Sequence, residues 1–231
     1  MIFSVQDQNI ELITDDKVFS PSLHGTEGLG SCIRIENGDT VLDIGTGTGI
    51  LGILAAKKGG KVIATDLSIH AVNLTKKNAE KNQVILDVRQ GDLFQPIDNQ
   101  SFDVIIANLP QEVLSPKLLE RYSKETVMGM HGGNNGNEIL LRFLQDVSHH
   151  MSAKTRLYVV AYAMADFRTT IQYIITHFQV RLVNFLTSEV KNFVYDDLEW
   201  YMGRAADGFM NLYKKENTYF SDLFVFELTL K

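Results

Sequence analysis

The 231-residue sequence predicts an α/β fold built on a seven-stranded, mostly parallel sheet with a final antiparallel strand. Two observations favour this fold. Short apolar runs alternate with stretches of helical periodicity from residue 40 to residue 186, which is the pattern of strand–helix–strand units. The last apolar run, 224–230, has no helix directly before it, so we expect it to enter the sheet through a hairpin and to run antiparallel.

Composition and charge narrow the possibilities. Hydrophobic residues make up 45% of the chain, so we expect one main domain at 40–231, preceded by an N-terminal extension or lid at 1–39. The net charge of −6 argues against a broad phosphate-binding surface, and a nucleic-acid partner is not expected. Cys32 is the single cysteine, which favours a reducing compartment. The sequence shows no signal peptide and no apolar run of ~18 residues, so we expect a cytoplasmic protein without a membrane partner; the oligomeric state stays open.

A glycine-rich turn after the first strand of this domain is the centre of the predicted site. Asp43 ends the strand, and Gly45, Gly47 and Gly49 follow it at alternate positions. Alternating glycines permit positive φ angles and let a ligand approach the backbone N–H groups. Residues 47–52 match the G-x-G-x-x-G of dinucleotide-binding folds, but an acid at the strand end would repel a pyrophosphate. The same acid would attract the ammonium and sulfonium groups of S-adenosylmethionine (SAM), and we favour SAM.

The ends of the next two strands carry further acids. The strand at 61–66 ends in Asp66, where a carboxylate accepts hydrogen bonds from the ribose hydroxyls in nucleotide-binding α/β folds. The strand at 84–89 is followed by Asp92, which can accept from an adenine amino group; an ordinary surface acid is the alternative. The predicted cofactor-binding residues are Asp43, Gly45, Thr46, Gly47, Gly49, Asp66, Leu67, Asp92, Leu93 and Asn108.

The strand at 101–108 runs into Asn108-Leu109-Pro110-Gln111. In an open parallel sheet, ligands lie outside the carboxyl ends of the strands where the strand order reverses, so the tetrapeptide and the glycine turn should face one crevice. We expect Asn108, Leu109, Pro110 and Gln111 to be the catalytic residues. A nitrogen nucleophile needs hydrogen-bond acceptors, which suits Asn108, whereas an oxygen nucleophile would want a general base. The sequence shows no metal-site pattern.

The outer elements follow the same alternation. Residues 190–220 are rich in aromatic and acidic residues and fit either a substrate lid or an amphipathic helix, so we expect a helical insertion there. The other expected elements are helices at 26–35, 49–58, 68–82, 137–151 and 166–178, strands at 40–44, 156–162 and 180–186, a mixed segment at 114–125 and a loop at 128–136.

The ordered set of glycine turn, Asp66, Asp92 and 108–111 resembles the class I SAM-dependent methyltransferases, which have a Rossmann-like fold. Within that class the chain is most similar to the HemK-type glutamine methyltransferases and their small-domain relatives. Two further segments carry this similarity, namely Phe19-Ser20-Pro21-Ser22 and His131-Gly132-Gly133-Asn134-Asn135-Gly136. The resemblance covers about residues 19–145 and the final strand.

The resemblance implies a chemistry for the tetrapeptide. In the family, the asparagine side-chain oxygen and the next carbonyl accept from the NH₂ group that is methylated, and the usual tetrapeptide is Asn-Pro-Pro-Tyr. This chain has Asn108-Leu109-Pro110-Gln111, without the first proline and without the aromatic that packs a planar amide. We expect methyl transfer from SAM to a nitrogen of a small molecule or peptide. The alternatives are a protein-glutamine or RNA N-methyltransferase, an O-methyltransferase, a non-catalytic SAM-binding protein and a dinucleotide oxidoreductase.

Overall fold

The computed structural model describes residues 1–20 and 23–231; Pro21 and Ser22, part of the segment that carried the HemK-type similarity, lie outside the described residues. The strands are β1 Ile2–Val5, β2 Gln8–Glu11, β3 Thr40–Ile44, β4 Lys61–Asp66, β5 Leu86–Gln90, β6 Phe102–Ala107, β7 Met151–Tyr162, β8 Phe178–Glu189, β9 Tyr213–Lys215 and β10 Thr218–Leu230. The helices are α1 Leu23–Gly30, α2 Ile50–Lys57, α3 Ile69–Lys81, α4 Pro116–Arg121, α5 Lys124–Met130, α6 Glu138–Asp146, α7 Phe167–His177, α8 Asn192–Tyr195 and α9 Leu198–Ala206, with a 3₁₀ turn at Val147–His150.

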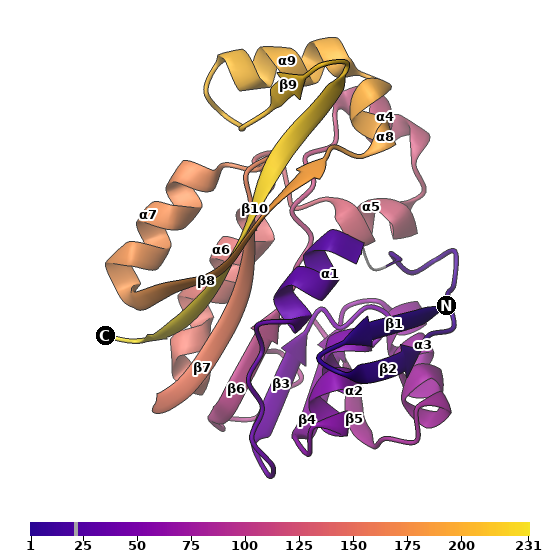
Figure 1. Cartoon of the computed structure of the whole chain (residues 1–231), viewed down its shortest axis with the longest axis vertical. Helices are drawn as coiled ribbons and strands as arrows, with labels where there is room; N and C mark the ends of the chain where they lie inside the picture. The colour runs from indigo at the N-terminus through magenta and orange to yellow at the C-terminus, as the bar shows by residue number, and fades with distance from the viewer. Residues whose placement is uncertain (21–22) are drawn as a thin grey trace.

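One large sheet organises the chain in the order β5-β4-β3-β6-β7-β10-β8, and β9 pairs with β10 (Figure 1). The strands from β5 to β7 pair in parallel, whereas β10 runs antiparallel to both β7 and β8. The predicted fold is therefore confirmed, with a mostly parallel sheet and an antiparallel last strand. The short β9 adds a strand to the seven that the sequence predicted.

The strand order determines where a site can form. β3 lies between β4 and β6, so the chain leaves the sheet centre in one direction after β3 and returns on its other side with β6. The carboxyl ends of these three parallel strands therefore meet at one edge, where the order reverses, and ligands bind at such a point in open α/β sheets. The residues that follow β3, β4 and β6 are those that the sequence singles out.

Helices cover both faces of the sheet, and each face has its own apolar cluster. On one face, α1, α2 and the β1–β2 hairpin pack on inward side chains such as Val41 and Val104. On the other face, α6 and α7 pack on the alternate residues, such as Leu42 and Ile105. A third cluster joins α4, α5, α8 and α9 beyond the carboxyl ends of the strands, around the fully buried Tyr201.

The structure differs from the predicted elements mainly near the N-terminus. The β1–β2 hairpin was not predicted, because its two strands have four residues each and together bury only three apolar side chains, which is too short a pattern to identify. The helix expected at 26–35 is α1, which begins earlier and ends at Gly30. The segment expected to be a loop at 128–136 starts inside α5. Within 190–220, the structure has α8, α9 and β9, with the apolar side of α9 packed in the third cluster.

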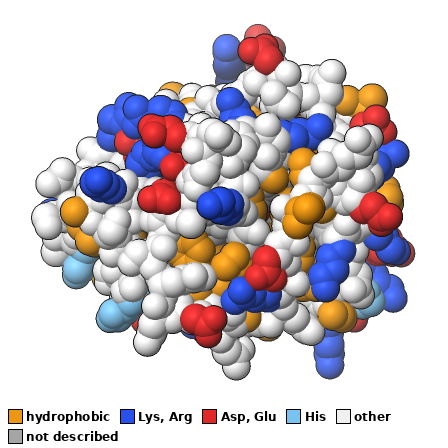
Figure 2. All heavy atoms as spheres, turned by 90° about the horizontal axis from the view of Figure 1, so that it is seen from below, with side chains coloured by type: hydrophobic (Ala, Val, Ile, Leu, Met, Phe, Trp, Pro, Cys, Tyr) orange, Lys and Arg blue, Asp and Glu red, His pale blue; other side chains and the backbone are white. Residues whose placement is uncertain are grey.

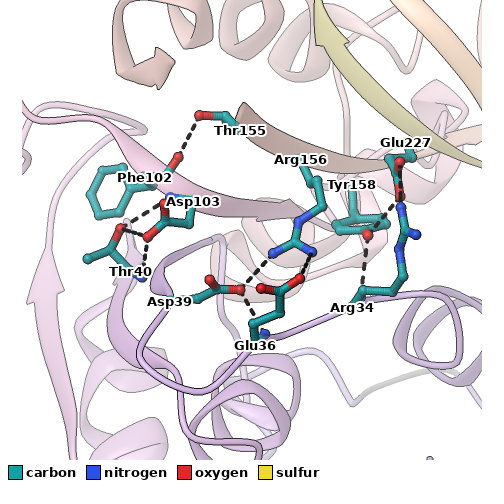
Figure 3. A network of polar contacts seen from close by, with 10 residues as sticks. All are labelled: Arg34, Glu36, Asp39, Thr40, Phe102, Asp103, Thr155, Arg156, Tyr158 and Glu227. Carbon is teal, nitrogen blue, oxygen red and sulfur yellow. Dashed lines mark hydrogen bonds and ion pairs between the residues drawn. The ribbon is translucent and has the colours of Figure 1, made fainter. Parts of the chain in front are cut away.

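A polar network fastens the segment before β3 to the sheet (Figure 3). Glu227 of β10 accepts hydrogen bonds from Tyr158 at 2.8 Å, Arg34 at 2.9 Å and Arg181 at 2.5 Å. Burial tends to raise the pKa of Glu227, but these three donors outweigh it and the pKa lies below its usual range. The network therefore ties the incoming chain to β7, β8 and β10 with an ionised carboxylate at its centre.

Further polar contacts lie at the amino-terminal ends of the strands, opposite the carboxyl edge. Arg156 of β7 pairs with Asp39 at 2.7 Å, and Asp103 of β6 accepts from both the backbone N–H and the hydroxyl of Thr40 at 2.8 Å. On the face that Figure 2 shows, Lys and Arg side chains are interspersed with Asp and Glu. Among the described residues, the structure has no helix that is both long enough and apolar enough to span a membrane.

Candidate active site

A cavity of about 440 Å³ lies at the carboxyl ends of β3, β4 and β6. It brings together almost all of the residues that the sequence predicts: Asp43, Gly45, Thr46, Gly47, Asp66, Leu67, Asp92, Leu93, Asn108, Leu109, Pro110 and Gln111. Of the predicted site residues that the structure describes, Gly49 does not line the cavity; it is the N-cap residue of α2. The size is within the range typical of small-molecule sites.

The glycine turn is open toward the cavity at its centre. Gly45 and Gly47 have φ angles of 69° and 57°, a conformation that favours glycine. A Cβ at Gly47 would meet no atom within 4 Å, whereas one at Gly45 would lie 2.9 Å from Leu109 of the tetrapeptide. The turn therefore forms a cradle that a ligand can approach closely, and Gly45 allows the tetrapeptide to pack against it.

Asp43 supports this turn from below. Its side chain is buried, and Oδ2 accepts from the Thr46 hydroxyl at 2.6 Å and from the Gly52 backbone N–H at 2.9 Å. Burial raises the pKa of Asp43 to about 6, although the hydrogen bonds from Thr46 and Gly52 oppose the rise. One oxygen of Asp43 thus holds the turn against the first turn of α2, and the carboxylate places a negative charge beneath the cavity.

Asp66 joins the ends of β3 and β4. Its Oδ2 accepts from the backbone N–H of Gly47 at 2.9 Å, and its Oδ1 accepts from that of Ser68 at 2.8 Å. Burial raises the pKa of this carboxyl as well. Since an ionised carboxylate has about four acceptor positions, Asp66 still has acceptor capacity for hydroxyl groups of a ligand.

Asp92 also lines the cavity, and it has a partner that the sequence did not indicate. Arg142 of α6 donates to its Oδ2 at 2.6 Å. The next residue, Leu93, has a φ angle of 47°, so the backbone turns sharply after Gly91. Both Leu93 and Arg142 line the cavity, and Arg142 could not be found from local sequence because it is 50 residues away from Asp92.

The tetrapeptide separates into two parts. Asn108 is half-buried, and its side chain makes no hydrogen bond with any of the residues that the structure describes. Gln111 is buried, and its amide bridges the end of β7 by donating to the Val160 carbonyl at 2.9 Å and accepting from the Tyr162 N–H at 3.0 Å. Asn108 therefore has its polar atoms available for a ligand, whereas those of Gln111 are engaged by the neighbouring strand.

Another part of the cavity wall is built from residues that were not predicted as site residues, although Phe19 belongs to a segment that carries the family resemblance. Phe19, Glu112, Tyr162 and Lys191 line it, and Glu112 forms an ion pair with Lys191. Burial, followed by the negative charge of Glu112, raises the pKa of Tyr162 well above its usual range. These residues come from four distant segments, and no local sequence pattern indicates that Glu112, Tyr162 and Lys191 would lie together. Among the described residues, no group of three or more His, Cys, Asp or Glu side chains is arranged to hold a metal ion.

Comparison with known proteins agrees with this geometry. Residues 9–117 match the family model of the methyltransferase small domain. The chain is 32% identical over 148 residues to a candidate protein N5-glutamine methyltransferase of Methanocaldococcus jannaschii, and the match covers 64% of this chain and 73% of that protein. It is also 37% identical over 119 residues to the ribosomal protein L11 methyltransferase of Dictyoglomus turgidum, across 49% of this chain and 39% of that protein.

Among solved structures, a methyltransferase from Pyrococcus furiosus has the same fold, with a TM-score of 0.58, 15% identity and coverage of 94% of this chain and 88% of that one. The fold, the site and the relatives together define a class I methyltransferase. The chain belongs to the SAM-dependent methyltransferase family that contains the methyltransferase small domain. It is an enzyme of that family with SAM as its cofactor, and the predicted family and cofactor are confirmed. The chain spans about two fifths of the length of the L11 methyltransferase that it matches.

Proposed function

We propose that this enzyme methylates a nitrogen atom held at Asn108, and that the nitrogen belongs to a peptide or a small molecule. The observation that supports this most is the available amide of Asn108, which lies in the same cavity as the glycine turn and Asp66. Its relatives point the same way, since one is named for protein glutamine and another for ribosomal protein L11.

The residues present fit SAM. The open cradle at Gly47 leaves room for the methionine part, and the Asp43 carboxylate beneath it complements that part's positive charge. Asp66 would accept from the two ribose hydroxyls, and Asp92 from the adenine amino group, beside the apolar Leu93. When bound, SAM supplies a methyl group on a sulfonium, whose C–S bond breaks as the new bond to the acceptor forms.

Asn108 would hold and orient the acceptor. Its side-chain oxygen and the Leu109 carbonyl can each accept an N–H, which turns the nitrogen lone pair toward the methyl carbon. Pro110 keeps the backbone beyond Leu109 in a restricted conformation. Gln111 would act indirectly, because its amide anchors the tetrapeptide to β7. An acceptor nitrogen held in this way releases its proton to water after transfer.

Isothermal titration with SAM, S-adenosylhomocysteine and NAD tests the cofactor part, and transfer from methyl-labelled SAM to glutamine peptides and small amides tests the acceptor part. Micromolar binding of both adenosyl compounds with labelled product would support the proposal. Adenosyl binding without transfer to any nitrogen acceptor would contradict N-methylation.

The cytoplasmic location stays a prediction, which cell fractionation would check.

A further inference from the structure

Glu112 is a buried carboxylate placed directly after the tetrapeptide. Its residue is 7% exposed. Its backbone N–H donates to the Met130 carbonyl at 2.9 Å, and its own carbonyl accepts from the Gly132 N–H at 3.0 Å. Because the main chain is held on both sides, Glu112 cannot retreat from the cavity that it lines. A fixed, buried carboxylate needs a cation beside it.

That cation is Lys191, which is held much less tightly. Lys191 comes from the turn between β8 and α8, and its ammonium pairs with Glu112 and lies 4.5 Å from the centre of the Phe19 ring. Its side chain is 34% exposed, against 9% for Glu112. A lysine has a flexible four-carbon stem and a strongly hydrated head, so Lys191 can move into water without leaving a buried charge behind.

This difference in burial determines which acceptors the pair admits. A cationic group can displace Lys191 and pair with Glu112, and the cost is that of moving a partly exposed lysine side chain into water. An anionic group would have to share Lys191 with Glu112 and so lie close to a like charge, or draw Lys191 away and leave the Glu112 carboxylate buried and unpaired. Breaking a buried pair by removing one partner is strongly unfavourable. The pair therefore selects by the sign of the acceptor's charge.

The residues around this pair also favour a positively charged acceptor. The ring of Phe19 contacts the Lys191 ammonium, and the same ring face can contact the incoming cation once Lys191 has moved away. Glu125 and Glu189 are exposed carboxylates that line the same cavity. Of the other cations lining it, Arg142 is bound to Asp92, and Lys17 is exposed on the N-terminal segment.

We propose that Lys191 is an internal place-holder for a cationic group of the methyl acceptor, and that Glu112 and Phe19 bind that group when it arrives. The acceptor would thus carry an ammonium or guanidinium group near the nitrogen that is methylated. This inference rests on the proposed function only in taking the cavity as the acceptor site. A basic side chain of a peptide and a free amine share this chemistry.

The test measures equilibrium binding of charged probes by NMR titration, at about pH 8 with the protein saturated with S-adenosylhomocysteine. The small probes are n-butylammonium and butyrate, and the peptide probes are Ala-Lys-Gln-Lys-Ala and Ala-Glu-Gln-Glu-Ala. We expect the wild-type protein to bind the cationic member of at least one pair with a Kd at least about tenfold lower than that of the anionic member. This ratio corresponds to the free energy of one charge-assisted hydrogen bond. The pair with the larger preference identifies the source of the cation.

Two variants make the result specific. Lys191→Met keeps the stem but removes the place-holder, so it should bind the cationic probe about tenfold more tightly than wild type. Glu112→Gln keeps the shape but removes the charge, so it should lose the preference. Arg121→Met is the matched control, because it breaks the exposed pair with Asp196, which directly follows α8, without touching the cavity, and it should leave all affinities unchanged.

Equal binding of both charges by wild type, preference for the anionic probes, or an unchanged preference in Glu112→Gln would each overturn the proposal. If Lys191→Met fails to fold, the comparison of wild type with Glu112→Gln still decides. Calorimetry with S-adenosylhomocysteine separates this result from the cofactor assignment, since either one can fail while the other holds.

Discussion

Replacing Asp66 by alanine should weaken cofactor binding strongly. Asp66 accepts a backbone N–H from Gly47 at 2.9 Å and one from Ser68 at 2.8 Å, and its remaining acceptor positions suit the ribose hydroxyls. Hydrogen bonds to a charged group contribute about 1.5–3 kcal/mol each. The loss of two predicts a change of about 3–6 kcal/mol, which corresponds to a Kd at least about 100-fold higher.

Calorimetry with S-adenosylhomocysteine measures this change directly, and far-UV circular dichroism shows whether the variant is folded. The matched control is Asp103→Ala, which removes a carboxylate that also accepts two hydrogen bonds, from the Thr40 backbone and hydroxyl, but lies at the opposite edge of the sheet. The control should lose stability and keep its affinity. A folded Asp66→Ala protein with a Kd within about twofold of wild type would refute the ribose assignment.

Three further predictions concern the same cavity. The folded-state pKa of Asp43 is raised from 3.8 to about 6, so its ionisation opposes folding by up to about 3 kcal/mol; the cost is absent below about pH 4 and present in full above about pH 6. Asp43→Asn should therefore gain stability in urea unfolding at about pH 8 and little at about pH 4, and an equal effect at both values would argue against it. Asn108→Ala should lower turnover at least about 100-fold and still bind S-adenosylhomocysteine; normal turnover would exclude Asn108 as the acceptor-holding group. Gln111→Leu leaves the Val160 carbonyl and the Tyr162 N–H without their partner, so thermal or urea unfolding should show a loss of about 2–4 kcal/mol, and full stability would contradict the anchoring role.

The central sheet could be predicted because its strands are short, apolar and bounded by strong local signals. β3 and β4 have the predicted bounds, and Ser68 caps α3 as expected by accepting from the Ala71 N–H. The β1–β2 hairpin could not be predicted in this way, because its stability comes from packing Phe3 and Ile10 on the face that α2 covers. Whether such a segment forms a strand depends on its burial against distant residues, which the local sequence pattern does not show.

The candidate site divides along a similar line. Asp43, Asp66 and Asn108 lie at the carboxyl ends of β3 and β4 or directly after β6, so strand order alone predicts that they line one crevice. The pairing of Gln111 with the β7 backbone was not foreseeable, because it depends on the exact distance between two strand ends. The Glu112–Lys191 pair joins residues 79 positions apart, and neither lies in a recognisable motif.

The position of β10 between β7 and β8 has a consequence for how the enzyme is made. The predicted cofactor-binding residues, together with Arg142 that pairs with Asp92, all lie between 43 and 142, so they are synthesised well before β10. β8 pairs with β10 and not with β7, so the turn that carries Lys191 has no sheet to join until residues 218–230 have left the ribosome. A nascent chain can thus assemble the predicted cofactor site first, and it acquires the wall proposed to face the methyl acceptor only after residues 218–230 have been synthesised.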